Sequence, residues 1–181
     1  EDEHREFLQM LQSKYECKVV GMLGEDEGCD SEIVVLNRVI RLRRDEKGLV
    51  LEYEPDQRHA ELIVERLGLT GAHAVATPRL KKTHRDLPML LKSPPLSGSQ
   101  VTEYRSLVMR GAYLAQDRAD INEATKHLAR RMKEPRECDW LDLKRFGRYL
   151  AGKPRVVTQS RQQEPPLGLI GTMDADHAGC V

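Results

Sequence analysis

The residues of this chain that could bind a metal lie near its C-terminal end. An apolar run that begins at Leu167 leads to Asp174, and Asp176 follows two positions later, on the same side of an ideal strand. A buried strand that presents a carboxylate at its end indicates a site, although spacing alone favours an ordinary strand-end or turn aspartate. His177 and Cys180 form an H-x-x-C pair without a second pair, so we expect no metal site from them.

A second candidate site is a group of basic residues in the C-terminal half. Lys144, Arg145 and Arg148 lie opposite the apolar side of an expected helix. Cations placed in this way could neutralise the phosphates of a nucleic-acid duplex and position it without reading its sequence. A solvated helix face is the alternative that the charge pattern leaves open. Further basic residues nearby are Arg130, Arg131, Lys133, Lys153 and Arg155.

Composition limits the classes of protein that these residues could belong to. The chain has 181 residues, 39% of them hydrophobic, which is enough for one domain or two small ones. Its formal net charge is zero, but residues 1–32 carry −7 and residues 126–155 carry +6. The longest apolar stretches fall far short of the roughly 20 residues of a membrane-spanning helix.

The cysteines and the N-terminal residues indicate where the chain resides. Four cysteines without a Cys-x-x-Cys pair favour reduced, intracellular thiols over a disulfide framework or a zinc ribbon. The opening Glu-Asp-Glu-His has neither an initiator Met nor a basic-then-apolar leader, so we expect no signal peptide and a piece of a longer protein.

The N-terminal half predicts a hairpin between two helices. Apolar residues at helical spacing predict a short amphipathic helix over 6–15. Residues 33–42 and 49–53 are expected to be strands, joined by a turn at 44–48 in which Gly48 adopts a positive φ. A helix should then begin at Pro55 and end at Gly68, with an apolar side made of Leu62, Ile63, Leu67 and Leu69.

The C-terminal half predicts a connector and three helices. Prolines and glycines mark residues 77–99 as a connector. Two helices should meet near Asp117, with Asp120 capping the second, and a third should end at Gly152 and Pro154. Arg118 and Asp120 are expected to pair at this junction. The apolar sides of the three helices, in order, comprise Tyr104, Leu107, Val108, Gly111, Leu114 and Ala115; Ile121, Ala124, Leu128 and Met132; and Trp140, Leu143, Gly147 and Leu150. Core packing, rather than base stacking, is expected for Trp140, Phe146, Tyr104 and Tyr113.

The order of motifs in the chain resembles the Pol polyprotein of copia-type LTR retrotransposons. The hairpin, the helix over 61–68 and Ala76-Thr77-Pro78 occur in the order expected of that family. Several longer motifs carry the resemblance, which covers nearly the whole chain: Tyr104-Arg-Ser-Leu-Val, Tyr113-Leu-Ala-Gln-Asp-Arg-Ala-Asp-Ile, Trp140, Leu143-Lys-Arg-Phe-Gly-Arg-Tyr-Leu and Asp174-Ala-Asp-His-Ala-Gly-Cys. The family usually has Trp at the position of His177.

The resemblance implies an α+β chain from the C-terminal part of a reverse transcriptase and the start of RNase H. Residues 1–78 would be the end of the palm, with a primer-positioning hairpin and the first thumb-like helix. Residues 79–100 would be the connector, and residues 101–155 a helical thumb-like or connection-like region. Residues 156–181 would begin an incomplete RNase H-like domain with its first strand.

The resemblance also implies site residues, a cofactor and partners. Asp174 would be a catalytic carboxylate that binds Mg²⁺, although one carboxylate cannot hold the two ions that phosphodiester hydrolysis needs. Partners would be a primer–template duplex or RNA–DNA hybrid and the remainder of the Pol polyprotein, in a cytoplasmic particle or the nucleus, with no membrane. The residues expected to contact nucleic acid are Lys144, Arg145, Arg148, Lys153 and Arg155.

Two functions stay open on this basis. The first is an enzyme fragment that helps to hold the duplex for RNA-directed DNA synthesis. The second is a catalytically inactive remnant of the same element that serves as a nucleic-acid-binding or structural helical module. The 181 residues contain no Tyr-x-Asp-Asp motif, which carries two metal-binding aspartates of the polymerase site in this family.

Overall fold

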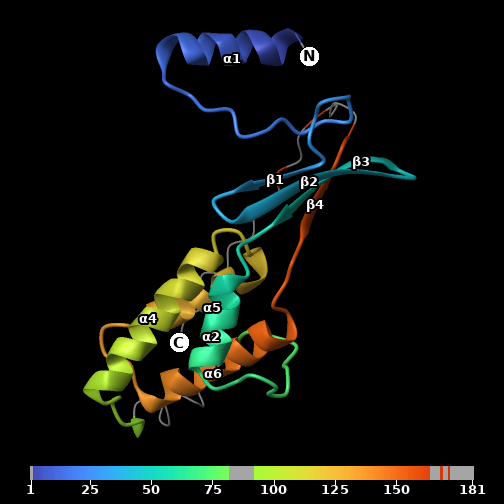
Figure 1. The fold of residues 1–181 in the computed structure, drawn as a ribbon. Coiled ribbons are helices and arrows are strands. Elements are labelled where there is room, and N and C mark those ends of the chain that lie inside the picture. The colour runs from blue at the N-terminus through green and yellow to red at the C-terminus, as the bar shows by residue number, and fades with distance from the viewer. Residues whose placement is uncertain (1, 82–91, 164–167, 169–170, 172–181) are drawn as a thin grey trace. The chain divides into compact units, whose positions relative to one another are not determined.

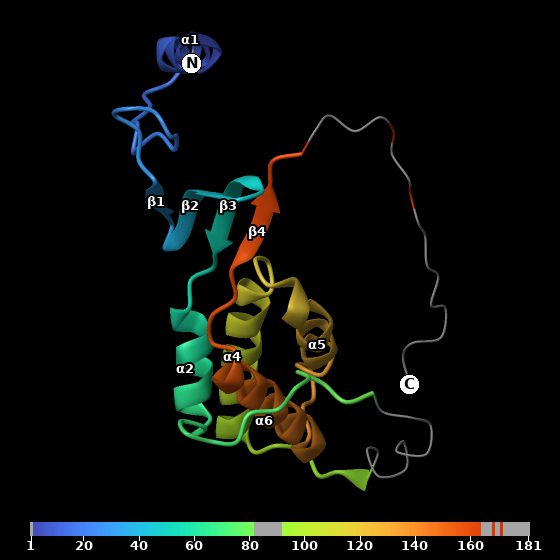
Figure 2. The ribbon, with the colours of Figure 1, turned by 90° about the vertical axis from the view of Figure 1, so that its right-hand side faces the viewer.

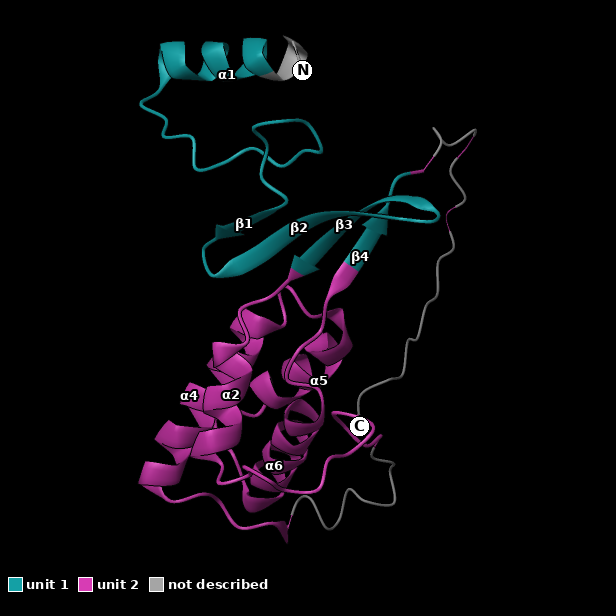
Figure 3. Cartoon of the chain, turned by 45° about the vertical axis from the view of Figure 1, so that its right-hand side comes forward, with its two compact units in different colours: residues 1–53, 159–162 teal, residues 54–158, 163–181 magenta. Residues whose placement is uncertain are grey.

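The computed structural model describes residues 2–81, 92–163, 168 and 171. In this part of the chain, five helices and four strands confirm the expected α+β class (Figure 1). The chain divides into two compact units, the first comprising residues 1–53 and 159–162 and the second residues 54–158 and 163–181 (Figure 3).

The first unit contains one helix and most of a four-stranded antiparallel sheet. Helix α1 (Asp2–Lys14) confirms the predicted N-terminal helix, and Phe7 and Met10 on its apolar side are exposed. The strands follow one another across the sheet in the order β1-β2-β3-β4, and β1 pairs with β2 so that Ile33 lies opposite Ile40. Their bounds are β1 (Glu32–Val35), β2 (Arg38–Asp45), β3 (Gly48–Glu54) and β4 (Thr158–Arg161).

The single strand predicted over 33–42 is wrong, because a tight turn divides it into β1 and β2. Leu36 and Asn37 form this turn with φ values of 51° and 62°. Two-residue hairpin turns of this kind need positive φ at both central residues, and Asn-Gly or Asp-Gly is their usual signal. A leucine at the first position concealed the turn within an apolar run. The second turn was predicted correctly, and Gly48 there has a φ of 116°.

Strand β4 was not predicted, because all four of its residues are polar and exposed and show no apolar alternation. Polar contacts to β2 and β3 hold it at the edge of the sheet. The Gln162 amide donates to the Leu49 carbonyl at 3.0 Å, and Arg161 forms an ion pair with Asp45 at 2.6 Å. The strand predicted near Asp174 lies outside the described residues.

The second unit is a four-helix assembly, α2 (Arg58–Arg66), α4 (Gly98–Leu114), α5 (Ala119–Ala129) and α6 (Glu137–Gly152), drawn in Figure 2. Its core confirms the apolar sides predicted for these helices. Most of the predicted residues are buried, and Leu62, Met132 and Trp140 are partly buried. The buried ones are Ile63, Leu67, Leu69, Tyr104, Leu107, Val108, Gly111, Leu114, Ala115, Ile121, Ala124, Leu128, Leu143, Gly147 and Leu150.

Two helix starts differ from those predicted. The helix expected from Pro55 begins at Arg58. Just before it, the Asp56 carboxylate accepts a hydrogen bond from the Arg58 amide at 3.1 Å. Helix α5 begins at Ala119, so Asp120 lies in its first turn and is not its cap. An acidic residue in the first turn is favourable near the positive end of the helix dipole, and here it also binds Arg118.

Candidate nucleic-acid interface

Helix α6 carries three of the five residues predicted to contact nucleic acid, and one side of it packs tightly into the core. Leu143, Gly147 and Leu150 lie on that side. A Cβ atom added at Gly147 would come within 2.7 Å of the Cδ1 atoms of Leu67 and Leu69. Gly147 thus lets α6 approach the end of α2 closely, and the side of α6 opposite the core is left to its polar residues.

Three residues at positions i, i+3 and i+7 of α6 form a row away from the core, which we call the α6 row: Leu141, Lys144 and Arg148. Leu141 is 65% exposed, Arg148 is exposed and Lys144 is partly exposed. Neither Lys144 nor Arg148 has an ion-pair or hydrogen-bond partner among the residues that the structure describes. Within the described part of the chain, a ligand could bind their charges without breaking an ion pair or hydrogen bond.

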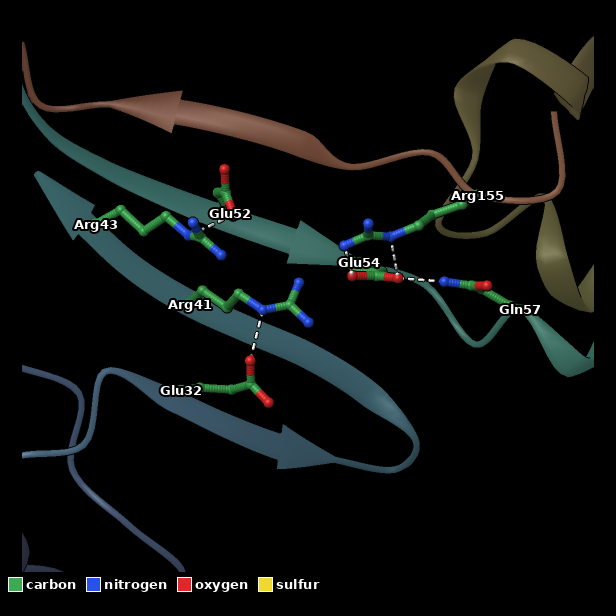
Figure 4. A network of polar contacts seen from close by, with 7 residues as sticks. All are labelled: Glu32, Arg41, Arg43, Glu52, Glu54, Gln57 and Arg155. Atoms are coloured by element: carbon green, nitrogen blue, oxygen red, sulfur yellow. Dashed lines mark hydrogen bonds and ion pairs between the residues drawn. The ribbon is translucent and has the colours of Figure 1, made fainter. Parts of the chain in front are cut away.

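Arg145 and Arg155, by contrast, have internal partners. The Arg145 Nη2 atom donates to Thr77 Oγ1 at 2.9 Å. The Arg155 guanidinium binds the Glu54 carboxylate through Nε at 2.6 Å and Nη2 at 2.7 Å, and Gln57 donates to the same carboxylate (Figure 4). Because Glu54 neutralises its charge, Arg155 is a weaker candidate for phosphate contact than Lys144 or Arg148.

Several arginines of the sheet are also paired with carboxylates. Arg41 binds Glu32, and Arg43 lies 3.1 Å from Glu52 (Figure 4). Outside that view, the Arg161 hydrogen bond holds the pKa of Asp45 below its usual value. Carboxylates of the sheet thus already neutralise Arg41, Arg43 and Arg161.

The C-terminal end of α6 is held by a buried arginine from the junction of α4 and α5. The Arg118 side chain is 1% exposed and binds the Asp120 carboxylate through Nε at 3.1 Å and Nη2 at 2.6 Å. Its Nη1 atom donates to the Lys153 carbonyl at 2.8 Å, and the Tyr149 hydroxyl donates to Asp120 Oδ2 at 2.8 Å. These contacts confirm the predicted pairing of Arg118 with Asp120.

Burial and hydrogen bonding act in opposite directions on the Asp120 carboxyl. Burial opposes its ionisation, but hydrogen bonds from Arg118 and Tyr149 outweigh this and hold its pKa below the usual value. Burial and the neighbouring Asp120 raise the pKa of Tyr149. Asp120 is therefore ionised and Tyr149 protonated at neutral pH, as the observed hydrogen bond requires.

The N-terminal end of α6 is held by the chain segment before α4. Arg136 Nη1 donates to the Ser93 carbonyl at 2.7 Å, and the Cys138 amide donates to Ser93 Oγ at 3.0 Å. The Arg136 amide donates to Asp139 Oδ2 at 2.8 Å, which caps the first turn. Contacts from other segments thus fix both ends of the helix that carries the α6 row.

Core packing is confirmed for three of the four aromatic residues considered for base stacking. Tyr104 and Phe146 are buried, and Trp140 packs partly buried against the core. Tyr113 is 39% exposed and lies against the His59 ring, with 4.6 Å between ring centroids. The core-packing prediction is therefore wrong for Tyr113.

The described residues present no metal site. No group of three or more His, Cys, Asp or Glu in this part of the chain is placed to hold an ion. Asp174, Asp176, His177 and Cys180 lie outside the described residues. Among the described helices, none has the length and apolar character needed to cross a membrane.

Comparison with known proteins gives one informative similarity. The chain is 34% identical over 140 residues, 77% of its length, to the retrovirus-related Pol polyprotein from transposon RE2 of Arabidopsis thaliana. This similarity supports a retrotransposon Pol origin. The chain spans about 9% of that relative's length. No family model matches the chain, and no solved structure matches it.

Proposed function

We propose that the chain is the reverse transcriptase–RNase H junction of a copia-type Pol polyprotein and helps to hold a primer–template duplex. The observation that carries this proposal is the α6 row, where Lys144 and Arg148 present charges one helical turn apart on a helix held at both ends. The similarity to a retrotransposon Pol polyprotein supports this proposal. The partner that we propose for the α6 row is a polyanion, an RNA–DNA hybrid. We assign the holding of the duplex, not the transfer of nucleotides, to these residues.

The contact would work by charge and position. Each phosphate that Lys144 or Arg148 neutralises releases condensed counterions, so affinity falls as salt rises. The exposed Lys153 just beyond α6 adds a third cation, whose Nζ atom lies 5.4 Å from the centroid of the Tyr149 ring. Contacts of this type set the register of a duplex on the protein without reading its bases.

Reversing the charge of the α6 row tests this proposal. We expect the double variant Lys144→Glu/Arg148→Glu to bind an RNA–DNA primer–template about 50-fold more weakly at 0.1 M salt, because two phosphate contacts are lost. The slope of log affinity against log salt should fall in magnitude by about 1.8. Fluorescence anisotropy over a salt series measures both quantities.

A control with the same charge change is available on other exposed lysines of this unit. Lys81→Glu/Lys126→Glu alters the net charge equally but leaves α6 unchanged. If the α6 row binds the duplex, this control should lose much less affinity than the α6 double variant. Equal losses in the two double variants would show that only net charge matters, and wild-type affinity of the α6 variant would refute the proposal.

We also propose that Asp174 is the first carboxylate of the RNase H site and binds Mg²⁺ together with acidic residues of the same polyprotein. The support is its place after an apolar run within the motif Asp174-Ala-Asp-His-Ala-Gly-Cys. In a Pol polyprotein that carries this segment, Asp174→Asn should abolish cleavage of the RNA strand of a hybrid and leave DNA synthesis largely intact. Unchanged cleavage in a gel assay would remove Asp174 from the site.

A further inference from the structure

The network of Arg118, Asp120 and Tyr149 converges on the residue that follows α6. We propose that these three are positioning residues for duplex binding, which fix Lys153 at the end of α6 for contact with a phosphate of the duplex. This inference rests on the proposed function and adds three residues that do not themselves contact the ligand.

The geometry of Arg118 holds its three hydrogen bonds in a fixed arrangement. Its guanidinium is planar and presents donors in a rigid fork, so two bonds to Asp120 define the plane in which the third donor lies. That third donor, Nη1, bonds to the Lys153 carbonyl 35 residues away in the chain. The backbone at Lys153 is therefore tied to the start of α5 by a side chain that is 1% exposed.

Tyr149 contacts the side chain of the same residue. Its hydroxyl donates to Asp120 Oδ2, the oxygen that Arg118 Nη2 also binds. Its ring lies below the Lys153 ammonium, with 5.4 Å from Nζ to the ring centroid, which is within the range of a cation–π contact. Arg118 thus fixes the backbone of Lys153, and Tyr149 fixes its side chain.

Stability alone does not require this arrangement. A buried ion pair can often be replaced by apolar residues without loss of stability, and the role that we assign to this pair is to specify geometry. Arg105 offers a comparison within the same unit. It donates to the carbonyls of Met132 and Lys133 at 2.7 and 2.9 Å, without reaching α6 or Lys153.

The test uses Tyr149→Phe, which keeps the ring and removes only the hydroxyl. We expect this variant to bind an RNA–DNA primer–template up to about eightfold more weakly at 0.1 M salt, with a salt slope smaller in magnitude by up to about 0.9, as one phosphate contact is weakened or lost. Arg118→Lys should act in the same direction if it folds. Arg105→Met, measured alongside at a temperature where circular dichroism shows every variant folded, should keep the wild-type slope.

A second readout does not depend on nucleic acid. In wild-type protein, the Tyr149 ring should shift the NMR signals of the Lys153 side-chain methylene groups, and Tyr149→Phe should change these shifts while those of Lys144 stay constant. If wild-type protein binds the duplex and Tyr149→Phe has the same affinity and slope, the positioning inference is wrong and the proposed function stands. If wild-type protein does not bind at low salt, both are wrong.

Discussion

Replacement of Arg118 by methionine should lower the free energy of unfolding of the helical unit by about 3 to 5 kcal/mol, because it removes the charge partner of Asp120 and leaves that carboxylate with the Tyr149 hydroxyl as a donor. Arg118 is almost fully buried, and it supplies two hydrogen bonds to Asp120 and one to the Lys153 carbonyl. Urea unfolding followed by circular dichroism measures the change. A loss below about 1 kcal/mol, which is the range of exposed ion pairs, would contradict the buried network.

Removal of both partners provides the control for this result. Arg118→Met/Asp120→Asn should be less destabilised than Arg118→Met alone, since no unpaired charge remains. The recovery should be incomplete, because the Lys153 carbonyl still lacks its donor. A double variant as unstable as the sum of the two single variants would show that the two side chains act independently.

The same pair gives stability a dependence on pH. The pKa of Asp120 is lower in the folded protein than its ordinary value, so the folded state binds fewer protons at this site than the unfolded state. The resulting stability is fully present above the unfolded pKa of about 4 and is lost as pH falls through the folded pKa. The stabilities of wild-type protein and Asp120→Asn should therefore converge in acid and differ most above about pH 5.

Replacement of Tyr104 by alanine should be comparably destabilising, at about 3 to 5 kcal/mol, which is the range for large aromatic side chains removed from cores. Tyr104 has no exposed surface, and its hydroxyl donates to the Leu128 carbonyl at 2.9 Å, which links α4 to α5. Burial raises the pKa of this hydroxyl well above its usual value, so it stays protonated as the bond requires. Urea unfolding gives the free energy directly.

Tyr104→Phe separates packing from hydrogen bonding at this position. It should cost about 1 kcal/mol, since the ring is kept and the Leu128 carbonyl loses one hydrogen bond while the Arg131 amide still donates to it at 3.1 Å. Its affinity for a primer–template should equal that of wild-type protein, because the ring is enclosed in the core. A folded Tyr104→Phe protein that bound the duplex more weakly would indicate a role outside the core.

The helices of the second unit could be predicted from sequence because periodicity reports burial. Apolar residues recur every three or four positions along each of these helices. Leu107 of α4, Leu128 of α5 and Leu150 of α6 belong to these patterns, and each is buried in the structure. Polar elements gave no such signal. The residues of β4 enter the sheet through hydrogen bonds and ion pairs with residues more than 100 positions away, and no local pattern marks them.

The basic residues show a similar limit. Their charge and helical spacing are visible in the sequence, but their internal partners are not. Glu54, which binds Arg155, lies 101 positions away, and Thr77, which binds Arg145, lies 68 positions away. The sequence therefore proposed five equivalent cations, whereas the structure separates Lys144 and Arg148 from the two that have internal partners.

The most direct test of duplex binding at the α6 row is an NMR titration of the isotopically labelled chain with an RNA–DNA primer–template at low salt. We expect the largest changes in the backbone amide signals of Leu141, Lys144 and Arg148 and in those around Lys153. These changes should reverse when salt is raised to about 1 M, as counterion release requires. No change at low salt, or changes confined to residues away from α6, would contradict the account.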